Sequence, residues 1–332
     1  MQKNYYTTNA TWGSRGAMLN GRRASLARLT SFQSIISDLI DQLQLSNAKQ
    51  LYGNICLFKS TVFRFMTTSS LLLALNGSMV VVYSSFLLGY GMNPDLLIAA
   101  FSVTMAVYSL NKVTDKFEDS INRPEIASKS PVGFLVVSAA SMFAGLLIGI
   151  SKGLIPLAVL VVPLAIGLIY SIKPSRSVPR IKDILGLKSL TVATNWALVG
   201  CLLPVSIYGS NFEEASMVFL YIFIRVFVGT ILCDMPDERG DLMAGAETIP
   251  IKLGRNRTTR FLVIFNSLAV LWIVYCYTRG LFLQFTPALI FGVLYGYLAI
   301  WYFSKYSHRL TGRLMLDSEW LPIVCIAAIF AR

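Results

Sequence analysis

Long stretches of almost uncharged residues recur along the 332-residue chain and are separated by shorter polar stretches. About 20 apolar residues are enough to cross a lipid bilayer as an α-helix, so each long stretch predicts one membrane-spanning helix. Nine such stretches are present, at residues 68–90, 95–111, 132–150, 154–171, 184–207, 214–233, 259–278, 281–303 and 318–331, of which the last is short. The pattern predicts an all-α, polytopic membrane protein with nine transmembrane helices.

The first 58 residues have a different pattern. Residues 1–37 contain five basic residues and no acidic one, and they are rich in Ser, Thr and Asn, which is typical of an organelle transit peptide and equally of a disordered basic tail. Apolar residues then follow at helical spacing, which predicts an amphipathic helix on the membrane surface or a small packed cap. These are Ile35, Ile36, Leu39, Ile40 and Leu43. We expect residues 1–58 to form a basic, partly disordered N-terminal extension and residues 59–332 to form the transmembrane domain.

Charge is scarce in this chain and unevenly distributed. Only 14% of its residues are charged and 55% are hydrophobic, whereas a soluble domain has about 25% charged residues. The net charge of +12 is compatible with nucleic acid as a partner, but Lys and Arg concentrate in alternate connections, which is the positive-inside pattern of membrane proteins. We therefore expect membrane lipids and no nucleic acid as partners, with the N-terminus on the cytoplasmic (or stromal or matrix) side. The basic segments are residues 1–66, 111–131, 170–188, 234–260 and 304–314.

The stretch "NKVTDKFEDSINRP", residues 111–124, places carboxylates directly at the end of an apolar segment. Asn111, Asp115 and Asp119, here named the first acid cluster, are spaced four residues apart and would share one face of a helix. Carboxylates at this spacing repel each other, and burial raises the cost. A divalent cation removes that cost, and Mg²⁺ prefers oxygen ligands, often a carboxylate or two together with substrate phosphates.

A second group of acids closes the sixth apolar stretch, in "CDMPDERGD", residues 233–241. Asp234, Asp237 and Asp241, the second acid cluster, are spaced to share a helical face, and the charge pattern places them on the same membrane side as the first. Together the two clusters could hold two Mg²⁺ ions with a diphosphate between them, although acids beside bases at a helix end are often only a solvated face. Basic residues that could neutralise phosphate oxygens are Lys112, Arg123, Lys129, Lys173, Arg180, Lys182 and Arg239.

These residues resemble the motifs of the UbiA superfamily of intramembrane prenyltransferases. The family's NxxxDxxxD motif is matched by the first acid cluster, and the Arg-Pro that commonly follows is present as Arg123-Pro124. Its DxxxD motif, often part of a longer DxPDxxGD run, is matched by "DMPDERGD" at 234–241. The segments "AGAETIPIKLG" (244–254), "YSIKP" (170–174) and "GLKSL" (186–190) also resemble the family. The resemblance covers roughly residues 60–332, so residues 59–332 are interpreted as a UbiA-like prenyltransferase domain.

The resemblance implies nine helices around a central cavity, with the aspartate motifs at its cytosolic end. It also implies Mg²⁺-dependent transfer of a prenyl group from a prenyl diphosphate to a lipophilic acceptor, which could be an aromatic quinone precursor, a glycerophosphate ether or a chlorin; the DxPDxxGD run slightly favours the first. Asp115, Asp119, Asp237 and Asp241 are the expected catalytic metal ligands, and Asn111 and Asp234 are further candidate ligands. Glu118 is not part of the family pattern, so we expect Glu118→Gln to retain most activity.

Elementary chemistry is compatible with that assignment. Ionisation of an allylic diphosphate requires charge stabilisation of the leaving group, which metal ions and basic side chains supply, and the resulting carbocation must be kept from water. An aromatic ring at the inner end of a span could stabilise the cation, and Tyr170 is the best placed candidate. The single histidine, His308, lies in a basic connection and is expected to be solvated. The five cysteines have no CxxC spacing and indicate neither disulfides nor a zinc site.

Two other functions remain open on the sequence. A membrane terpene cyclase would ionise the same diphosphate without an acceptor. A transporter would use polar groups within the bilayer, such as Asn195 and Arg225, as a path. The acids of a cation path would lie at mid-bilayer, whereas these lie at helix ends on one side. Arg225 is nine residues from Asp234, or about 13 Å deeper, so we expect it to have a structural partner inside the bundle.

The charge pattern predicts that both acid clusters face the same compartment as the N-terminus. Single cysteines at positions 121 and 245, in a background without other cysteines, should therefore react equally with a membrane-impermeant thiol reagent added from one side. Labelling of the two positions from opposite sides would rule out a shared site.

Overall fold

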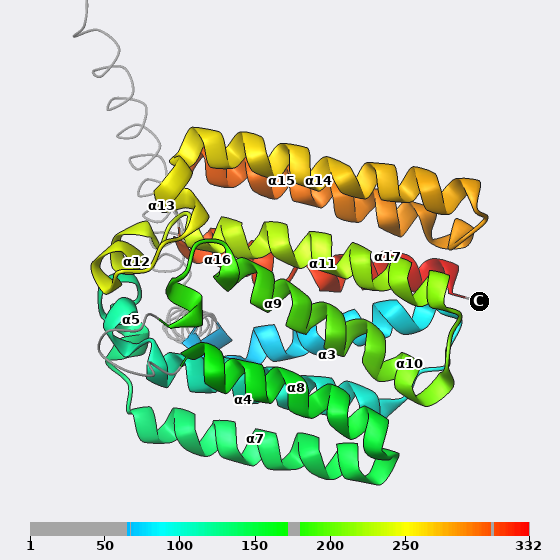
Figure 1. Cartoon of the computed structure of the whole chain (residues 1–332), viewed down its shortest axis with the longest axis horizontal. Helices are drawn as coiled ribbons and strands as arrows, with labels where there is room; N and C mark the ends of the chain where they lie inside the picture. Colours follow the sequence, from blue (N-terminus) through cyan, green and yellow to red (C-terminus); the bar gives the residue numbers. More distant parts are fainter. Residues whose placement is uncertain (1–64, 67, 172–179, 307–308, 332) are drawn as a thin grey trace, which may run out of the picture. The chain divides into compact units, whose positions relative to one another are not determined.

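The structure is a computed structural model that describes residues 65–331, except residues 67, 172–179 and 307–308. The predicted N-terminal extension, Lys173 and His308 therefore lie outside the described residues. The described residues form helices and connections without β-strands (Figure 1), and they belong to one compact unit that begins at Phe65. The predicted all-α fold is confirmed.

Within the described part of the chain, seven helical segments are long and apolar enough to cross a membrane. They are α4 (Pro94–Thr114), α7 (Pro131–Lys152), α8 (Leu154–Ser171), the continuous run Leu187–Tyr208, α11 (Phe212–Asp234), α14 (Arg255–Thr278) and Leu283–Lys305. The run Leu187–Tyr208 consists of α9 (Leu187–Ala197), a π-helical turn η2 (Leu198–Leu202) and α10 (Leu203–Tyr208). The run Leu283–Lys305 consists of η3 (Leu283–Phe285) and α15 (Thr286–Lys305).

The other two predicted spans are helical but shorter. The first is α3 (Leu71–Leu87), with 17 residues, and the last is α17 (Trp320–Phe330), with 11 residues. At 1.5 Å per residue an 11-residue helix extends about 16 Å, roughly half of the hydrocarbon core. The predicted count of nine complete spans is therefore not confirmed, although each of the nine apolar stretches does form a helix.

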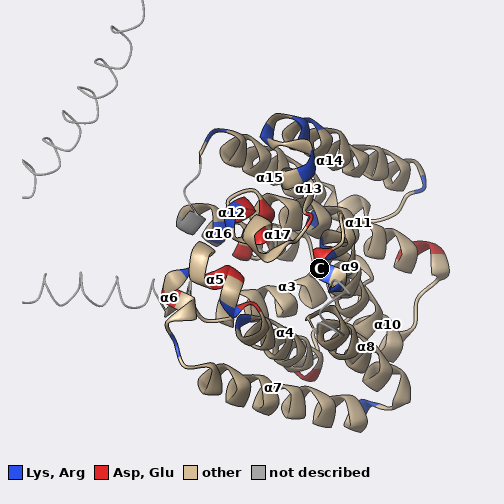
Figure 2. Cartoon of the chain, turned by 60° about the vertical axis from the view of Figure 1, so that its left-hand side comes forward, with Lys and Arg blue, Asp and Glu red and all other residues tan. Residues whose placement is uncertain are grey.

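Short polar helices gather at one end of the long ones, where Figure 1 shows α5, α12 and α13 beside one another. They are α5 (Lys116–Asn122), α6 (Pro124–Ala127), η1 (Ile181–Asp183), α12 (Glu238–Ala244), α13 (Ile249–Leu253) and α16 (Arg309–Asp317). Figure 2 shows many of the Asp, Glu, Lys and Arg residues on these short helices, while the long helices carry charge mainly near their ends. We call this end of the bundle its mouth.

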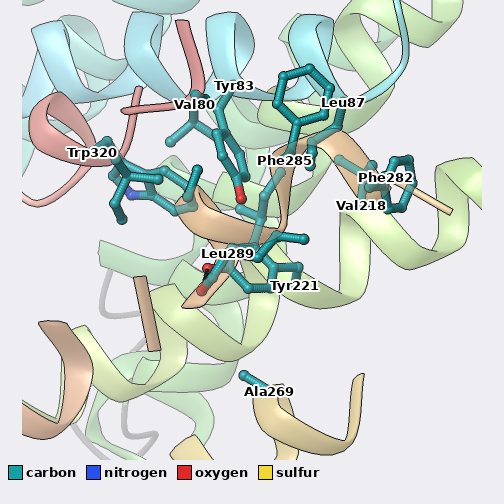
Figure 3. Close-up of a cluster of buried hydrophobic side chains, with 14 of the residues drawn as sticks. Val80, Tyr83, Leu87, Val218, Tyr221, Ala269, Phe282, Phe285, Leu289 and Trp320 are labelled. Carbon is teal, nitrogen blue, oxygen red and sulfur yellow. Dashed lines mark hydrogen bonds between the residues drawn. The ribbon is translucent and has the colours of Figure 1, made fainter. Parts of the chain in front are cut away.

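The core between the long helices combines aliphatic side chains with a cluster of aromatic rings (Figure 3). Tyr83 of α3 lies between Tyr221 of α11 and Trp320 of α17, with ring centroids 5.8 and 5.4 Å away. Tyr221 also packs against Trp272 of α14, with centroids 4.9 Å apart. Such rings bury a large apolar area in defined geometry, and here they join helices from both ends of the chain.

A buried ion pair lies beside this core. Arg225 of α11 is only 2% exposed and forms an ion pair with Glu319 and a 2.8 Å hydrogen bond to the Asn266 side chain. Gly296 allows this approach, because a Cβ at that position would overlap with Arg225 and Asn266. The prediction that Arg225 has a structural partner within the bundle is confirmed.

Breaking this network should destabilise the protein. Arg225→Met leaves the Glu319 carboxylate buried without its cation, so we expect the free energy of unfolding to fall by about 3–5 kcal/mol, measured by denaturant unfolding in detergent micelles. Arg279→Met is the matched control, because Arg279 pairs with Glu213 on the surface with both side chains well exposed, and exposed pairs contribute little. Equal stability of the two variants would contradict a stabilising role for the buried network.

A candidate active site at the mouth of the bundle

A cavity of about 230 Å³ opens among the short helices, and we call it the main cavity. Its lining includes all six residues of the two acid clusters, which are Asn111, Asp115, Asp119, Asp234, Asp237 and Asp241. Residues far apart in the sequence thus meet in one space, as the sequence predicts. Their roles as catalytic residues and metal ligands remain predictions.

Helix breaks position the acids, contrary to the expectation of two continuous helical faces. In the first acid cluster α4 ends at Thr114 and α5 begins at Lys116, so Asp115 occupies the junction. In the second, α11 ends at Asp234 and α12 begins at Glu238, so Asp237 lies in the turn. A break at each cluster redirects the chain at the mouth while the carboxylates remain directed into the cavity.

Asn122 connects the two helix breaks by hydrogen bonds. Its side-chain amide donates a 3.0 Å hydrogen bond to the backbone carbonyl of Asp237, and its side-chain oxygen accepts one of 3.1 Å from the backbone N–H of Gly240. Any Cβ at position 240 would overlap with the Asn122 amide, so the glycine of the "DERGD" sequence is required by this close approach. We call this contact the α5–α12 clasp.

Basic side chains are paired with the acids of the first cluster and their neighbours. Lys182 of η1 forms ion pairs with Asp115 and, at 3.3 Å, with Glu118. Arg180 reaches the same Glu118 at 2.6 Å. Arg123 lies 3.6 Å from Asp119. Glu118 and Asp119 are buried and would lack compensation without these ion pairs, whereas Asp115 is partly exposed.

The second acid cluster is paired in the same way. Lys188 of α9 lies 2.6 Å from Asp234 and 3.2 Å from Asp241. Asp237 accepts hydrogen bonds from Arg123 at 3.0 Å and from Arg313 of α16 at 2.6 Å. Lys188 and Arg313 were not among the predicted phosphate-binding residues, although "GLKSL" contains the first. The sequence offers only a weak indication for Arg313, namely its position in a short basic connection, four residues before Asp317.

The predicted phosphate-binding residues divide into two groups. Lys112, Arg123 and Lys182 line the main cavity. Lys129 and Arg239 do not: Lys129 donates a 2.6 Å hydrogen bond to Thr68, and Arg239 is exposed on α12. Arg239 is two residues from both Asp237 and Asp241, which turns it toward the opposite face of the helix. Arg180 is committed to Glu118 and Asp183 and is not part of the lining.

The balance between burial and counter-charge differs among the carboxylates. Burial raises the pKa of Asp119 to about 6, although Arg123 opposes the rise. Burial would also raise the pKa of Asp237, but Arg123 and Arg313 lower it below its ordinary value. Asp317, which also lines the main cavity, has a pKa raised to about 6 by burial. A cation that entered this space would therefore stabilise carboxylates that lack full compensation.

The chemistry of the lining fits a hard divalent cation. Among the described residues, no three Asp, Glu, His or Cys side chains converge closely enough to form a metal site, because Lys and Arg side chains lie between them. The available donors are nonetheless carboxylate and amide oxygens, which Mg²⁺ prefers. One of them, Oδ2 of Asp234, is buried without a hydrogen-bond partner in the described part of the chain. An unpaired buried carboxylate oxygen is costly and is well suited to a cation.

The predicted cation-stabilising residue also lines the main cavity. Tyr170 is 6% exposed at the inner end of α8. Its neighbour Ser171 donates a 3.1 Å hydrogen bond to the side-chain oxygen of Asn111. Away from the acid clusters most of the lining is apolar, with Leu73, Val192, Trp196, Val226 and Trp320. Asn76 and Glu319 also line this part, and Glu319 is paired with Arg225. The main cavity is thus charged at the mouth and mainly apolar inside the bundle.

A bundle of apolar helices with two aspartate motifs around one cavity is the arrangement that the resemblance to intramembrane prenyltransferases implies. The family model described as the UbiA prenyltransferase family matches residues 64–321. The chain therefore belongs to the UbiA prenyltransferase family, as the motifs predict. A comparison with curated proteins gave no match.

Solved structures share the fold at low sequence identity. A UbiA homolog from Archaeoglobus fulgidus bound to GPP and Mg²⁺ is 17% identical, with a TM-score of 0.61 over 80% of this chain and 96% of that one. An apo UbiA homolog from Aeropyrum pernix K1 is 19% identical, with a TM-score of 0.58 over 79% and 96%. A digeranylgeranylglyceryl phosphate synthase is 17% identical, with a TM-score of 0.54 over 81% and 98%.

Glu118 lies inside the site rather than beside it, so its expected tolerance to substitution is revised. It is 8% exposed, lines the main cavity and pairs with both Arg180 and Lys182. Hydrogen bonds to charged groups contribute about 1.5–3 kcal/mol, so we now expect Glu118→Gln to slow prenyl transfer by about tenfold or more. Glu125→Gln, at an exposed position of α6, is the control. Near-wild-type rates in a folded Glu118→Gln variant would restore the original expectation.

Proposed function

We propose that this protein transfers a prenyl group from a prenyl diphosphate to a lipophilic acceptor inside the membrane, with Mg²⁺ as cofactor. The observation that carries the proposal is the convergence of two acid clusters, separated by more than 100 residues of sequence, on one cavity with an apolar interior. The charged mouth suits a diphosphate, and the mainly apolar interior of the main cavity suits an isoprenoid tail. A homolog from Archaeoglobus fulgidus binds GPP and Mg²⁺, which supports a prenyl diphosphate as substrate and Mg²⁺ as cofactor.

In this proposal the acid clusters hold the cofactor. Asn111, Asp115 and Asp119 would provide ligands on one side, and Asp234, Asp237 and Asp241 would provide them on the other. When bound, Mg²⁺ would neutralise the diphosphate and stabilise it as a leaving group. Basic side chains that now pair with these acids would be released to the phosphate oxygens, with Lys182, Arg123, Lys188 and Arg313 in the best positions.

The reaction then proceeds at the boundary between the charged mouth and the apolar interior. The allylic C–O bond breaks, and its electron pair leaves with the diphosphate. The acceptor supplies the electron pair for the new bond to the allylic carbon and loses a proton. The apolar lining keeps water from the allylic cation, and the Tyr170 ring could stabilise its charge. The absence of water favours transfer over hydrolysis.

The acceptor and the topology are further parts of the proposal. We favour an aromatic quinone precursor as acceptor, within isoprenoid biosynthesis, because of the DxPDxxGD run. The mouth and the N-terminus would face the cytoplasm, stroma or matrix, as the basic connections indicate. Residues 1–58 would form an extension outside the prenyltransferase domain 59–332.

Substitution of single aspartates tests the proposal. Asp115→Asn and Asp237→Asn each remove one charge with little change of shape, so we expect prenyl transfer to slow by roughly 10²–10³-fold, the cost of losing one electrostatic contact in a transition state. Asp95→Asn is the matched control, because Asp95 begins α4 at the other end of the helix, with its side chain 52% exposed, and pairs with Lys152. Rates are measured with purified protein, prenyl diphosphates and a panel of acceptors by mass spectrometry.

The same assay separates the possible outcomes. Excess chelator should abolish turnover, and added Mg²⁺ should restore it. A cyclised hydrocarbon formed without any acceptor would identify a terpene cyclase instead of a transferase. If folded Asp115→Asn and Asp237→Asn variants both retained wild-type rates, the metal-ligand assignment would be wrong.

A further inference from the structure

A second pocket lies directly behind the main cavity. Its volume is about 40 Å³, and Tyr108 and Trp196 line both spaces. The indole N–H of Trp196 donates a 2.9 Å hydrogen bond to the Tyr108 hydroxyl. The two rings meet edge to face, with their centroids 6.3 Å apart. This hydrogen-bonded pair therefore forms part of the partition between the two spaces.

The partition lies at a defined depth below the acid clusters. Tyr108 precedes Asp115 by seven residues along α4, which is about 10 Å at the helical rise of 1.5 Å per residue. Trp196 follows Lys188 by eight residues along α9, which is about 12 Å. The two helices thus place their partition residues at the same depth. A chain that extends inward from the acid clusters would meet the pair at that distance.

The second pocket continues the apolar part of the main cavity. Most of its lining is small and apolar, namely Gly77, Val80, Val103, Val107, Pro163 and Val199. Val199 and Gly200 belong to the π-helical turn η2, and such turns are frequent at functional sites. Asn195 also lines it, and its side-chain oxygen is buried without a hydrogen-bond partner among the described residues. That oxygen offers an acceptor to the Tyr108 hydroxyl if the partition opens.

We propose that the Tyr108–Trp196 pair sets the length of prenyl chain that this protein accepts, and that the second pocket receives the end of a longer chain when the pair is opened. The inference rests on the proposed function, because it requires the diphosphate to lie at the acid clusters. With the pair closed, the apolar tail ends against the two rings. Removal of one ring joins the two spaces along the direction of the tail.

The test compares substrates of increasing length in partition variants. Wild-type protein, Trp196→Ala and Trp196→Leu are assayed with dimethylallyl, geranyl, farnesyl and geranylgeranyl diphosphate in the presence of Mg²⁺. For each protein, kcat/KM of the diphosphate one step longer than the preferred one is divided by kcat/KM of the preferred one. We expect this ratio to rise by about tenfold or more in both variants, because apolar pockets discriminate chain length on that scale. Two variants are used so that one folded protein is available if the smaller side chain prevents folding.

Three controls separate volume from other effects. Trp196→Phe removes the hydrogen bond but keeps a ring, and it should retain the wild-type ratio. Val107→Met added to Trp196→Ala fills the second pocket with a flexible side chain and should reverse the change. Trp301→Ala removes a tryptophan from the exposed surface of α15 and should leave the preference unchanged.

Binding of each diphosphate is measured in parallel by thermal stabilisation of the purified protein. A folded Trp196→Ala or Trp196→Leu variant that turns over substrate with the wild-type length preference would overturn the length-setting role and leave the proposed function intact. A wild-type protein that neither binds nor turns over any of the four diphosphates would overturn the proposed function, together with the inference that depends on it.

Discussion

Buried carboxylates need a counter-charge, and the mouth of this bundle is organised around that requirement. Lys182, Arg123 and Lys188 come from three different segments, and each pairs with an acid that the apolar bundle would otherwise destabilise. The pairs also keep the acids close together, which mutual repulsion would prevent. In the proposed function, a cation and an anion that enter this cavity together would replace these internal counter-charges.

The fold was largely predictable because the bilayer imposes a simple rule. Stretches such as 132–150 and 154–171 have almost no charge, and each forms one long helix. The rule does not hold for an apolar helix that packs against other helices instead of spanning the lipid. The last apolar stretch forms only the 11-residue α17, which packs through Trp320 against the aromatic core. The apolar pattern does not distinguish a span from a buried short helix.

The acidic half of the site was also accessible from the sequence, whereas its basic half was predicted only in part: Lys112, Arg123 and Lys182 line the main cavity as expected, but Lys188 and Arg313 were missed. The spacing of the aspartates marks them as a group even without a structure. Arg313 and Lys188 have no such spacing relative to the acids they contact, because the pairing depends on how α16 and the first turn of α9 are placed at the mouth. Arg239, in contrast, lies within the second motif but on the wrong face. Proximity in the sequence thus identified the acidic lining residues better than it identified their counter-ions.

The α5–α12 clasp has a consequence for biogenesis. Asn122 and Asp237 are separated by 115 residues, so the site depends on contacts of high sequence separation, which form late in folding. During translation the first acid cluster is synthesised long before the second. In the interval the carboxylates of α5 lack their final neighbours. Activity would therefore begin only after α12 is synthesised and docked. If the proposed function is right, a half-inserted chain could therefore not release a reactive carbocation into the bilayer.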